Sequence, residues 1–270
     1  MKILAGIVLF NPDLDRLKEN VQAIKSQVDE VIFFNNGSPV SEGIDNGFLC
    51  LDANGRNIGI ASALNLLCQY ALDHSFDWVL TLDQDSICPE GLIDEYKKYL
   101  DDSSIGMLCP CIIDRNYGSC HYDGQLSEGL EDVDACITSG SLIRLSAWQL
   151  VTGFWDDLFI DMVDFVICWS LRAHGYRIVR VRAKALFHEI GHSKKVNLFG
   201  KEEAVFNHSP IRSYYMARNA VAVGRKHHRL SQCLRWTMKR FLLVNLYEKN
   251  RWKKDIQFFK GLIDGIRMAV

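Results

Sequence analysis

Apolar runs alternate with segments of helical periodicity along the first part of the chain. Residues 3–10 and 30–34 are largely apolar runs, and each is closed by a turn-forming segment, 11–12 and 35–38 respectively. Between them, residues 14–24 place leucine, valine and isoleucine at the three- and four-residue spacing of an amphipathic helix. Uninterrupted apolar runs are typical of strands buried on both faces of a parallel sheet. The pattern therefore predicts a strand–helix–strand unit.

A third apolar run leads into an acidic tetrapeptide. Residues 54–61 form a glycine-bearing loop that opens a helix, and residues 78–82 form the next predicted strand. Asp83-Gln84-Asp85-Ser86 follows that strand directly. Open α/β sheets bind ligands just beyond the carboxyl ends of their strands. The sequence thus predicts an α/β fold with a nucleotide-sized cleft along this edge.

The α/β pattern continues through the middle of the chain. Strands are predicted at 105–110, 135–143 and 176–181, with a break in the second of them at Ser139-Gly140-Ser141, and a helix is predicted at 164–174. Gly175 follows that helix where glycine commonly ends helices, because it tolerates the left-handed conformation needed there. With no internal repeat and no Pro-rich or Gly/Ser-rich linker, we expect one α/β domain over residues 1–208.

Residues 209–270 differ in charge from the rest of the chain. They carry 14 Lys and Arg against 3 Asp and Glu, although the formal net charge of the whole chain is −2. An apolar helix face and the cations around it are formed by Leu230, Leu234, Met238, Phe241, Leu242, Arg229, Arg235, Lys239 and Arg240. We expect a basic helical extension that rests on an anionic membrane without crossing it. A core-docked helix with a solvated basic face is the alternative, and the same helices are a candidate homodimer contact.

The nine cysteines are scattered, and none forms a C-x-x-C pair. Together with the start Met1-Lys2-Ile3, which lacks the charged and apolar regions of a secretion signal, they predict a reduced cytoplasmic protein. A share of 48% apolar residues is enough for a continuous core, so extensive disorder is not expected.

Asp83 and Asp85 are the leading candidates for a metal site. The two residues lie two positions apart, so on the end of an extended strand both carboxylates project to the same side. They repel each other there unless a cation lies beside them. Mg²⁺ and Mn²⁺ take oxygen ligands and often retain substrate phosphates in their shell. His188, just after a predicted strand, is the expected third ligand. A solvated acidic turn is the alternative.

Three further side chains are candidates for chemistry. Asp161 and Asp164 lie at the start of the helix predicted at 164–174, where either could act as a general base for an attacking hydroxyl. A helix cap is the alternative role for Asp161. Arg218 is expected to neutralise a leaving diphosphate or a phosphate of the acceptor.

Eight short motifs occur in order along residues 1–225. They are Val8-Leu9-Phe10-Asn11-Pro12, Asn35-Asn36-Gly37-Ser38, Asn57-Ile58-Gly59-Ile60-Ala61-x-Ala63-x-Asn65, Asp83-Gln84-Asp85-Ser86, Thr138-Ser139-Gly140-Ser141, Phe159-Ile160-Asp161-Met162-Val163-Asp164, His188-Glu189-Ile190-Gly191-His192 and Tyr214-Tyr215-x-x-Arg218-Asn219. This series resembles family 2 of the inverting glycosyltransferases, which have the GT-A fold, and within it the bacterial rhamnosyltransferase-like branch. An ordered series is far more specific than any single motif.

The resemblance implies a GT-A domain, which is a Rossmann-like mixed sheet flanked by helices that binds a nucleotide sugar. Asp83 would contact the nucleoside, and Asp85 would hold the metal on the diphosphate. In the family, an acidic pair lies eleven residues ahead of the glycine that begins the next strand. Gly175 is that glycine here, so the resemblance implies that Asp164 is the base and that Asp161 supplies the second carboxylate. The residues that would line the donor pocket are Phe10, Asn11, Pro12, Asn36, Asn57 and Gly59, with Arg218 at the diphosphate.

The expected activity is a metal-dependent, inverting sugar transfer with Mn²⁺ or Mg²⁺. By the resemblance, the donor is dTDP-rhamnose. The basic C-terminal region indicates that the acceptor is a lipid-linked cell-surface glycan at the inner face of the plasma membrane. Another UDP- or dTDP-linked sugar, such as glucose, galactose or N-acetylglucosamine, is the alternative donor. A nucleotide- or nucleic-acid-binding module is the alternative from another class, but the acidic residues 1–208 would repel a polyanion, and we expect no nucleic acid partner.

Overall fold

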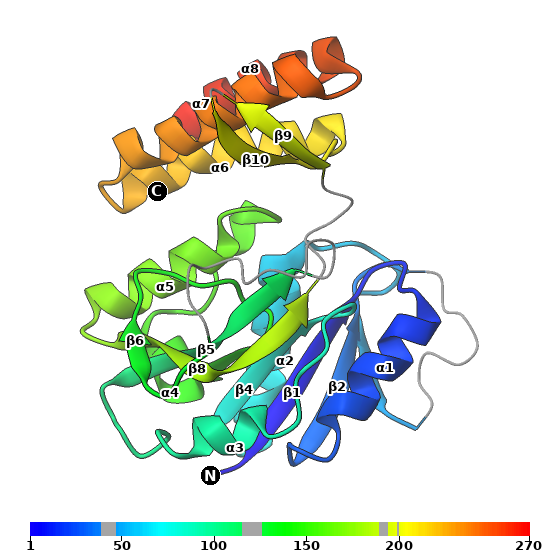
Figure 1. Cartoon of the computed structure of the whole chain (residues 1–270), viewed down its shortest axis with the longest axis vertical. Helices are drawn as coiled ribbons and strands as arrows, with labels where there is room; N and C mark the ends of the chain where they lie inside the picture. The colour runs from blue at the N-terminus through cyan, green and yellow to red at the C-terminus, as the bar shows by residue number, and fades with distance from the viewer. Residues whose placement is uncertain (39–46, 115–125, 189–193, 199) are drawn as a thin grey trace. The chain divides into compact units, whose positions relative to one another are not determined.

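The first two thirds of the chain contain the strands of a mixed eight-stranded sheet (Figure 1). The computed structural model describes residues 1–38, 47–114, 126–188, 194–198 and 200–270. The strand order is β3-β2-β1-β4-β7-β5-β8-β6. The strands are β1 (Ile3–Leu9), β2 (Glu30–Asn35), β3 (Leu49–Asp52), β4 (Trp78–Asp83), β5 (Ile105–Asp114), β6 (Leu130–Asp132), β7 (Ser141–Arg144) and β8 (Arg177–His188). The α/β fold class that the sequence predicted is confirmed.

The register of the parallel strands brings three carboxyl ends together. Strand β1 pairs in parallel with β2 on one side and with β4 on the other. Val8 lies opposite Phe34 in β2 and opposite Asp83 in β4. The loops that follow these strands therefore leave the sheet side by side, which is the edge where α/β sheets bind ligands.

Helices cover both faces of the sheet (Figure 1). Helix α1 (Leu14–Ile24) begins at Asp13, whose carboxylate caps it, and buries its apolar stripe in the same core cluster as α3 (Leu92–Lys97). Helix α2 (Ile60–Asp73) contacts β1 and β4, and Figure 1 places it on the other face. Two more helices, α4 (Leu145–Leu150) and α5 (Val163–Ala173), complete this part of the chain.

The strand predicted at 135–143 is wrong before its predicted break at Ser139-Gly140-Ser141, because only Ser141–Arg144 forms β7. Gly140 has a φ of 77°, and the Thr81 hydroxyl donates to the Thr138 carbonyl at 2.5 Å, so the chain turns here. In contrast, β8 runs well past the predicted end at residue 181 and so carries His188. Gly175 adopts the expected left-handed conformation after α5, with a φ of 86°.

The chain divides into two compact units. The sheet unit comprises residues 1–157 and 164–189, and the helical unit comprises residues 158–163 and 190–270. The sequence placed the boundary after residue 208, just before α6. The difference arises because β9 and β10 form a hairpin of their own, and β10 contacts α7. The elements of the helical unit are β9 (Lys194–Leu198), β10 (Lys201–Val205), α6 (Pro210–Lys226), α7 (Leu230–Tyr247) and α8 (Arg251–Arg267).

Two glycines set the packing of the helical unit. A Cβ atom on Gly261 or Gly265 of α8 would collide with the carbonyl oxygens of Tyr214 and Arg218 in α6, respectively. The backbones of α6 and α8 therefore approach more closely than helices with side chains at the contact can. This close contact leaves the opposite side of α8 facing outward.

The apolar face predicted on α7 is correct only in part. Met238 and Leu242 are exposed, but Phe241 packs on Phe258 of α8 with ring centroids 4.6 Å apart, and Arg240 forms an ion pair with Glu248. The periodicity alone could not separate the two sides because both are apolar. Among the helices that the structure describes, none combines the length and hydrophobicity needed to cross a bilayer.

Candidate functional site

Asp83, Asp85 and His188 form a cluster within the sheet unit. One oxygen of each carboxylate and one imidazole nitrogen all lie within 4.8 Å of one another. The His188 Nε2 atom lies 3.8 Å from an Asp83 carboxylate oxygen, and the two side chains are 12% and 42% exposed, respectively. The structure thus brings together the three residues that the sequence proposed as metal ligands.

An isolated β-bridge between Ile87 and Phe187 places His188 close to the two aspartates. Strand β4 ends at Asp83, and Asp85 lies in the turn that follows it. Ile87 and Phe187 then exchange backbone hydrogen bonds of 2.8 and 3.1 Å, which fastens the end of β8 to the segment after this turn. A turn, and not the alternation of an extended strand, therefore places Asp85 beside Asp83.

Two serines orient the His188 ring. The Ser86 hydroxyl lies 2.9 Å from His188 Nδ1 and 2.7 Å from the Ser139 hydroxyl. Ser139 Oγ in turn accepts the Asp83 backbone N–H at 3.0 Å. When Nδ1–H donates to Ser86, Nε2 presents its lone pair on the side of Asp83. Metal-binding histidines are commonly held by a hydrogen bond of this kind.

The chemistry of the cluster fits a divalent cation. Two carboxylates and one imidazole offer hard oxygen donors and one nitrogen donor, a set that suits Mn²⁺ or Mg²⁺ with substrate oxygens completing the shell. The partial exposure of Asp83 leaves room for such oxygens on the open side.

The loop after β1 is fixed by Gln84, the residue between the two aspartates. Its side-chain oxygen accepts the Phe10 backbone N–H at 2.8 Å, and its amide donates to the Phe10 carbonyl at 3.1 Å. The Asn11 backbone N–H donates to the Ser38 hydroxyl at 2.6 Å. The loop that holds Phe10, Asn11 and Pro12 is thus tied to the ends of both β2 and β4.

Asn36 joins the loops after β2 and before α2. Its side-chain oxygen accepts the Ile58 backbone N–H at 2.9 Å, and the Asn57 side chain accepts the Gly59 N–H at 2.9 Å. Gly37 has a φ of 89°, and a Cβ atom there would lie 2.6 Å from the Asn57 backbone nitrogen. The predicted donor-pocket residues of the sheet unit therefore lie on loops that hydrogen bonds connect.

Sequence reasoning missed Asn20, Gln84 and Ser86 as supports of this site. Asn20 is fully buried in α1 and donates to the Asp83 carbonyl at 2.7 Å. It lies between Leu17 and Val21 on the apolar face of that helix, and a polar residue at such a position is the signal that could have identified it.

Asp161 and Arg218 belong to the helical unit, where α6 holds the segment 158–163. Arg212 forms an ion pair with Asp161 at 3.0 Å, and Asn219 donates to the carbonyls of Leu158, Ile160 and Asp161. The Arg218 guanidinium donates to the Leu158 carbonyl at 3.0 Å and lies 4.8 Å from the centre of the Tyr215 ring.

The segment that α6 holds is strained. Phe159, Asp161 and Met162 all have φ values between 63° and 67°, a region that side chains other than glycine rarely adopt. Strain of this kind persists where surrounding contacts enforce it, often at functional sites. Asp164 lies in the sheet unit, in the first turn of α5, and its carboxylate accepts the Phe165 backbone N–H at 3.0 Å.

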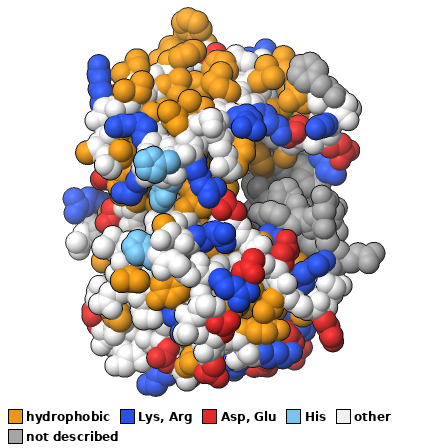
Figure 2. Space-filling view, turned by 90° about the vertical axis from the view of Figure 1, so that its left-hand side faces the viewer, with side chains coloured by type: hydrophobic (Ala, Val, Ile, Leu, Met, Phe, Trp, Pro, Cys, Tyr) orange, Lys and Arg blue, Asp and Glu red, His pale blue; other side chains and the backbone are white. Residues whose placement is uncertain are grey.

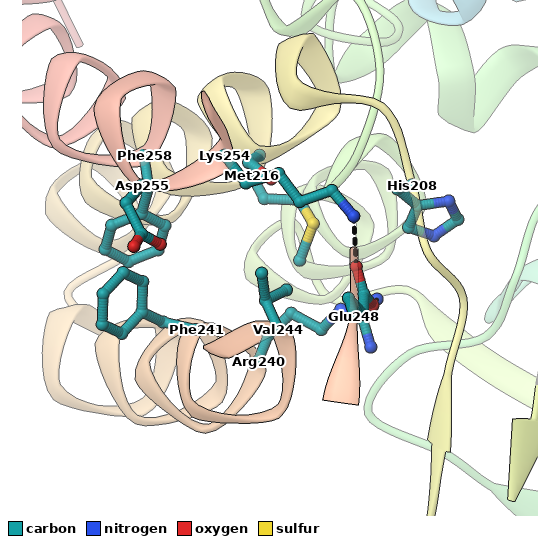
Figure 3. A pocket seen from close by; sticks show the side chains of 10 residues that line it. His208, Met216, Arg240, Phe241, Val244, Glu248, Lys254, Asp255 and Phe258 are labelled. Atoms are coloured by element: carbon teal, nitrogen blue, oxygen red, sulfur yellow. Dashed lines mark hydrogen bonds and ion pairs between the residues drawn. The ribbon is translucent and has the colours of Figure 1, made fainter. Parts of the chain in front are cut away.

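A separate pocket lies inside the helical unit (Figure 3). In Figure 3 the Lys254 ammonium points to the buried Glu248 carboxylate, at a distance of 2.8 Å, and Arg240 pairs with the same carboxylate. Burial would raise the pKa of Glu248, but Lys254 and Arg240 outweigh it and lower this pKa. Because the Glu248 carboxylate already pairs with both cations, we interpret the pocket as part of the framework of this unit.

His208 at this pocket predicts a loss of stability in acid. Burial, followed by the charges of Arg212 and Arg240, lowers its pKa from 6.5 to about 3. The unfolded chain therefore binds a proton here as the pH falls below about 6.5, while the folded chain resists until near pH 3. The stability from the neutral ring is complete above about pH 6.5 and declines below it. We expect His208 to contribute a loss of about 2 kcal/mol in the free energy of unfolding between pH 7.5 and pH 5.

Urea titrations of wild type and His208→Gln over that pH range test this expectation. The variant should lose that part of the pH dependence, whereas replacement of the exposed His174 should not. An unchanged pH slope in His208→Gln would contradict the assignment.

One comparison with known proteins identifies the family of the chain, and a curated relative aligns over nearly its whole length. The family described as "Glycosyl transferase family 2" matches residues 5–143. The chain is 27% identical over 288 aligned residues to "dTDP-rhamnosyl transferase RfbF" of Shigella flexneri, covering 98% of this chain and 95% of the relative.

Solved structures share the fold at low sequence identity. The TarS protein of S. aureus matches 99% of this chain with a TM-score of 0.65 and 14% identity, and the chain spans 49% of the full TarS length. A shorter TarS structure in complex with UDP-GlcNAc matches with a TM-score of 0.63 and 15% identity, over 81% of its length. A structure of GalNAc-T7 with UDP, GalNAc and Mn²⁺ covers 92% of this chain and 58% of its own, at a TM-score of 0.59 and 13% identity.

Proposed function

Because the chain belongs to glycosyl transferase family 2 and is a glycosyltransferase with the GT-A fold, we propose that it transfers rhamnose from dTDP-rhamnose to a hydroxyl of a lipid-linked glycan. The observation that carries the proposal is the meeting of Asp83, Asp85 and His188 at the carboxyl edge of the parallel strands. The relative described as a dTDP-rhamnosyl transferase, aligned over nearly the whole chain, supports the choice of donor.

The three clustered side chains would hold Mn²⁺ or Mg²⁺. Such an ion, when bound, neutralises negative charge on a diphosphate leaving group. Manganese in the GalNAc-T7 structure supports a metal in this fold. Phe10, Asn11, Pro12, Asn36, Asn57 and Gly59 would receive the base and ribose, because they lie on the connected loops beside Asp83.

In the proposed reaction, Asp164 takes the proton of the acceptor hydroxyl. The oxygen of that hydroxyl attacks the anomeric carbon, and the bond from this carbon to the diphosphate oxygen breaks, so the diphosphate leaves with the bonding electrons. A single in-line displacement of this kind inverts the anomeric configuration. Asp164 is favoured over Asp161 because it lies eleven residues ahead of Gly175, where the resemblance places the base. Arg218 is proposed to face the departing diphosphate.

We further propose that the chain acts in the cytoplasm, at the inner face of the plasma membrane, and contacts that membrane peripherally. The lipid-linked acceptor would be presented there. The excess of Lys and Arg in residues 209–270 supports an anionic contact.

A different donor is the second candidate. The TarS structure in complex with UDP-GlcNAc shares the fold, so UDP-linked N-acetylglucosamine is the specific competitor to dTDP-rhamnose. The same assay separates the two, because each donor is offered alone.

The test is donor turnover. The chain is incubated with dTDP-rhamnose, UDP-N-acetylglucosamine, UDP-glucose, UDP-galactose or GDP-mannose, with and without Mn²⁺, in the presence of lipid-linked acceptors, and the released nucleoside diphosphate is measured. We expect manganese-dependent release from dTDP-rhamnose and a product of inverted configuration by NMR. Asp164→Asn should abolish transfer, and Asp161→Asn should weaken it less. Turnover of another donor alone would replace the sugar assignment, and turnover in Asp164→Asn would remove its role as base.

A further inference from the structure

We propose that the outward face of α8 is the surface that docks onto an anionic lipid bilayer, with its apolar side chains inserted between headgroups. This inference rests on the membrane contact in the proposed function and assigns it to particular residues. The sequence had placed the membrane face on α7 residues around Phe241, which the structure places partly inside the helical unit.

The apolar stripe on α8 is continuous and exposed. It contains Trp252, Ile256, Phe259, Ile263 and Ile266, which are between 49% and 77% exposed. Their spacing of three and four residues places them in one line along the helix. The buried residues of α8, including Gly261 and Gly265, lie on the opposite side, against α6. A helix that packs on one side and exposes large apolar side chains on the other is expected to have a partner for that face.

Figure 2 shows hydrophobic side chains crowded over the upper part of the view, which belongs to the helical unit. Exposed apolar residues of α7, namely Met238, Leu242 and Leu246, add to those of α8. Among the residues that the structure describes, Trp252, at 77% exposed, is the most exposed large apolar side chain. Tryptophan is enriched at the boundary between lipid and water, because its ring is apolar and its N–H is polar.

A line of cations runs beside the stripe. Lys253, Lys260 and Arg267 are all exposed and lie seven residues apart, which places them along one flank of the apolar line. The two acidic residues of α8 are engaged inside the unit. Asp255 accepts a hydrogen bond from Asn245, and Asp264 accepts one from the Tyr214 hydroxyl, each at 3.0 Å. The flank therefore presents positive charge beside apolar side chains, as interfacial helices do.

This charge pattern favours lipid over a second copy of the chain. A symmetric antiparallel contact through α8 would place Lys260 opposite Lys260 of the other copy, and Lys253 opposite Arg267. Like charges would then face each other along the whole contact. An anionic bilayer instead offers phosphate groups to the cations and an apolar interior to the stripe.

The test is flotation of the full chain with vesicles of phosphatidylcholine, with and without phosphatidylglycerol. We expect binding that requires phosphatidylglycerol and weakens with added salt. The variant Lys253→Gln/Lys260→Gln/Arg267→Gln should bind about 100-fold more weakly. Ile256→Ser/Phe259→Ser/Ile263→Ser should also lose binding. Tryptophan fluorescence should shift to the blue on binding, and Trp252→Phe should remove most of that shift.

Matched controls lie on the sheet unit. Lys18→Gln/Lys97→Gln/Lys98→Gln removes three exposed cations there, and Leu66→Ser/Leu150→Ser removes exposed apolar side chains. Both should bind vesicles as wild type does. Wild-type binding by the α8 variants, or no binding by wild type, would overturn the docking surface. A dimer in sedimentation equilibrium that Ile256→Ser/Phe259→Ser/Ile263→Ser dissociates would assign the face to a second copy.

Donor turnover without vesicles separates this inference from the proposed function. With a short-chain, water-soluble analogue of the acceptor glycan, the α8 variants should release nucleoside diphosphate from the donor at the wild-type rate in detergent-free solution. Loss of vesicle binding with retained turnover supports the docking surface. Failure of turnover in wild type with intact vesicle binding would contradict the function and leave the surface standing.

Discussion

Replacing Asp85 with asparagine is expected to lower kcat for sugar transfer by about a thousandfold. The substitution keeps the size of the side chain but removes the charge that would hold a divalent ion next to Asp83 and His188. Without that charge, the negative diphosphate would leave with less compensation. Measurement of kcat at saturating Mn²⁺, together with the urea midpoint, separates lost chemistry from lost folding.

Asp94→Asn is the matched control for this substitution. Asp94 lies in α3 of the same unit and pairs at the surface with Lys97. We expect it to retain wild-type kcat, and we expect both variants to unfold at the wild-type urea midpoint. A kcat within a few fold of wild type in Asp85→Asn would mean that the carboxylates form a solvated turn and hold no metal.

Replacing Glu248 with alanine is expected to lower the free energy of unfolding by about 3–5 kcal/mol. Glu248 is 4% exposed and forms ion pairs with both Arg240 and Lys254. Lys254 is itself only 2% exposed. Its removal would leave two cations without their counter-ion inside the helical unit. The cost of uncompensated buried charge is larger than the value of the ion pair itself.

Urea denaturation followed by circular dichroism measures this effect. Glu202→Ala removes an exposed carboxylate that pairs with Lys195, and it should cost about 1 kcal/mol or less. Combining Glu248→Leu with Lys254→Met and Arg240→Met should recover much of the loss, because the buried charges are then gone together. A cost for Glu248→Ala as small as that for Glu202→Ala would mean that water reaches these charges.

The strands β1, β2 and β4 of the sheet could be predicted from the sequence because their signals are local. The runs 3–10, 30–34 and 78–82 are largely apolar, and each is followed by turn residues. Asp83 and Asp85 could be placed at a ligand-binding edge for the same reason. The strand predicted before Gly140 in the run 135–143 does not form. The chain turns there instead, with the Thr81 hydroxyl bound to the Thr138 carbonyl and Gly140 in the left-handed conformation.

Contacts between distant segments could not be predicted. The hydrogen bonds of Asn20 to Asp83 and of Ser86 to His188 join residues 63 and 102 positions apart, and no periodicity reports such pairs. Likewise, the apolar side chains of α7 and α8 have similar spacing on their buried and exposed sides. Only the packing of Gly261 and Gly265 against α6 decides which side of α8 faces out.

The central claim is that Asp83, Asp85 and His188 hold a divalent metal where the donor diphosphate binds. Electron paramagnetic resonance of Mn²⁺ in the presence of dTDP tests it most directly, because bound manganese loses the sharp spectrum of the free ion. We predict that wild type removes the free signal in a dTDP-dependent manner and that Asp85→Asn and His188→Ala do not. Equal manganese binding by wild type and both variants, or no binding by any of them, would contradict the claim.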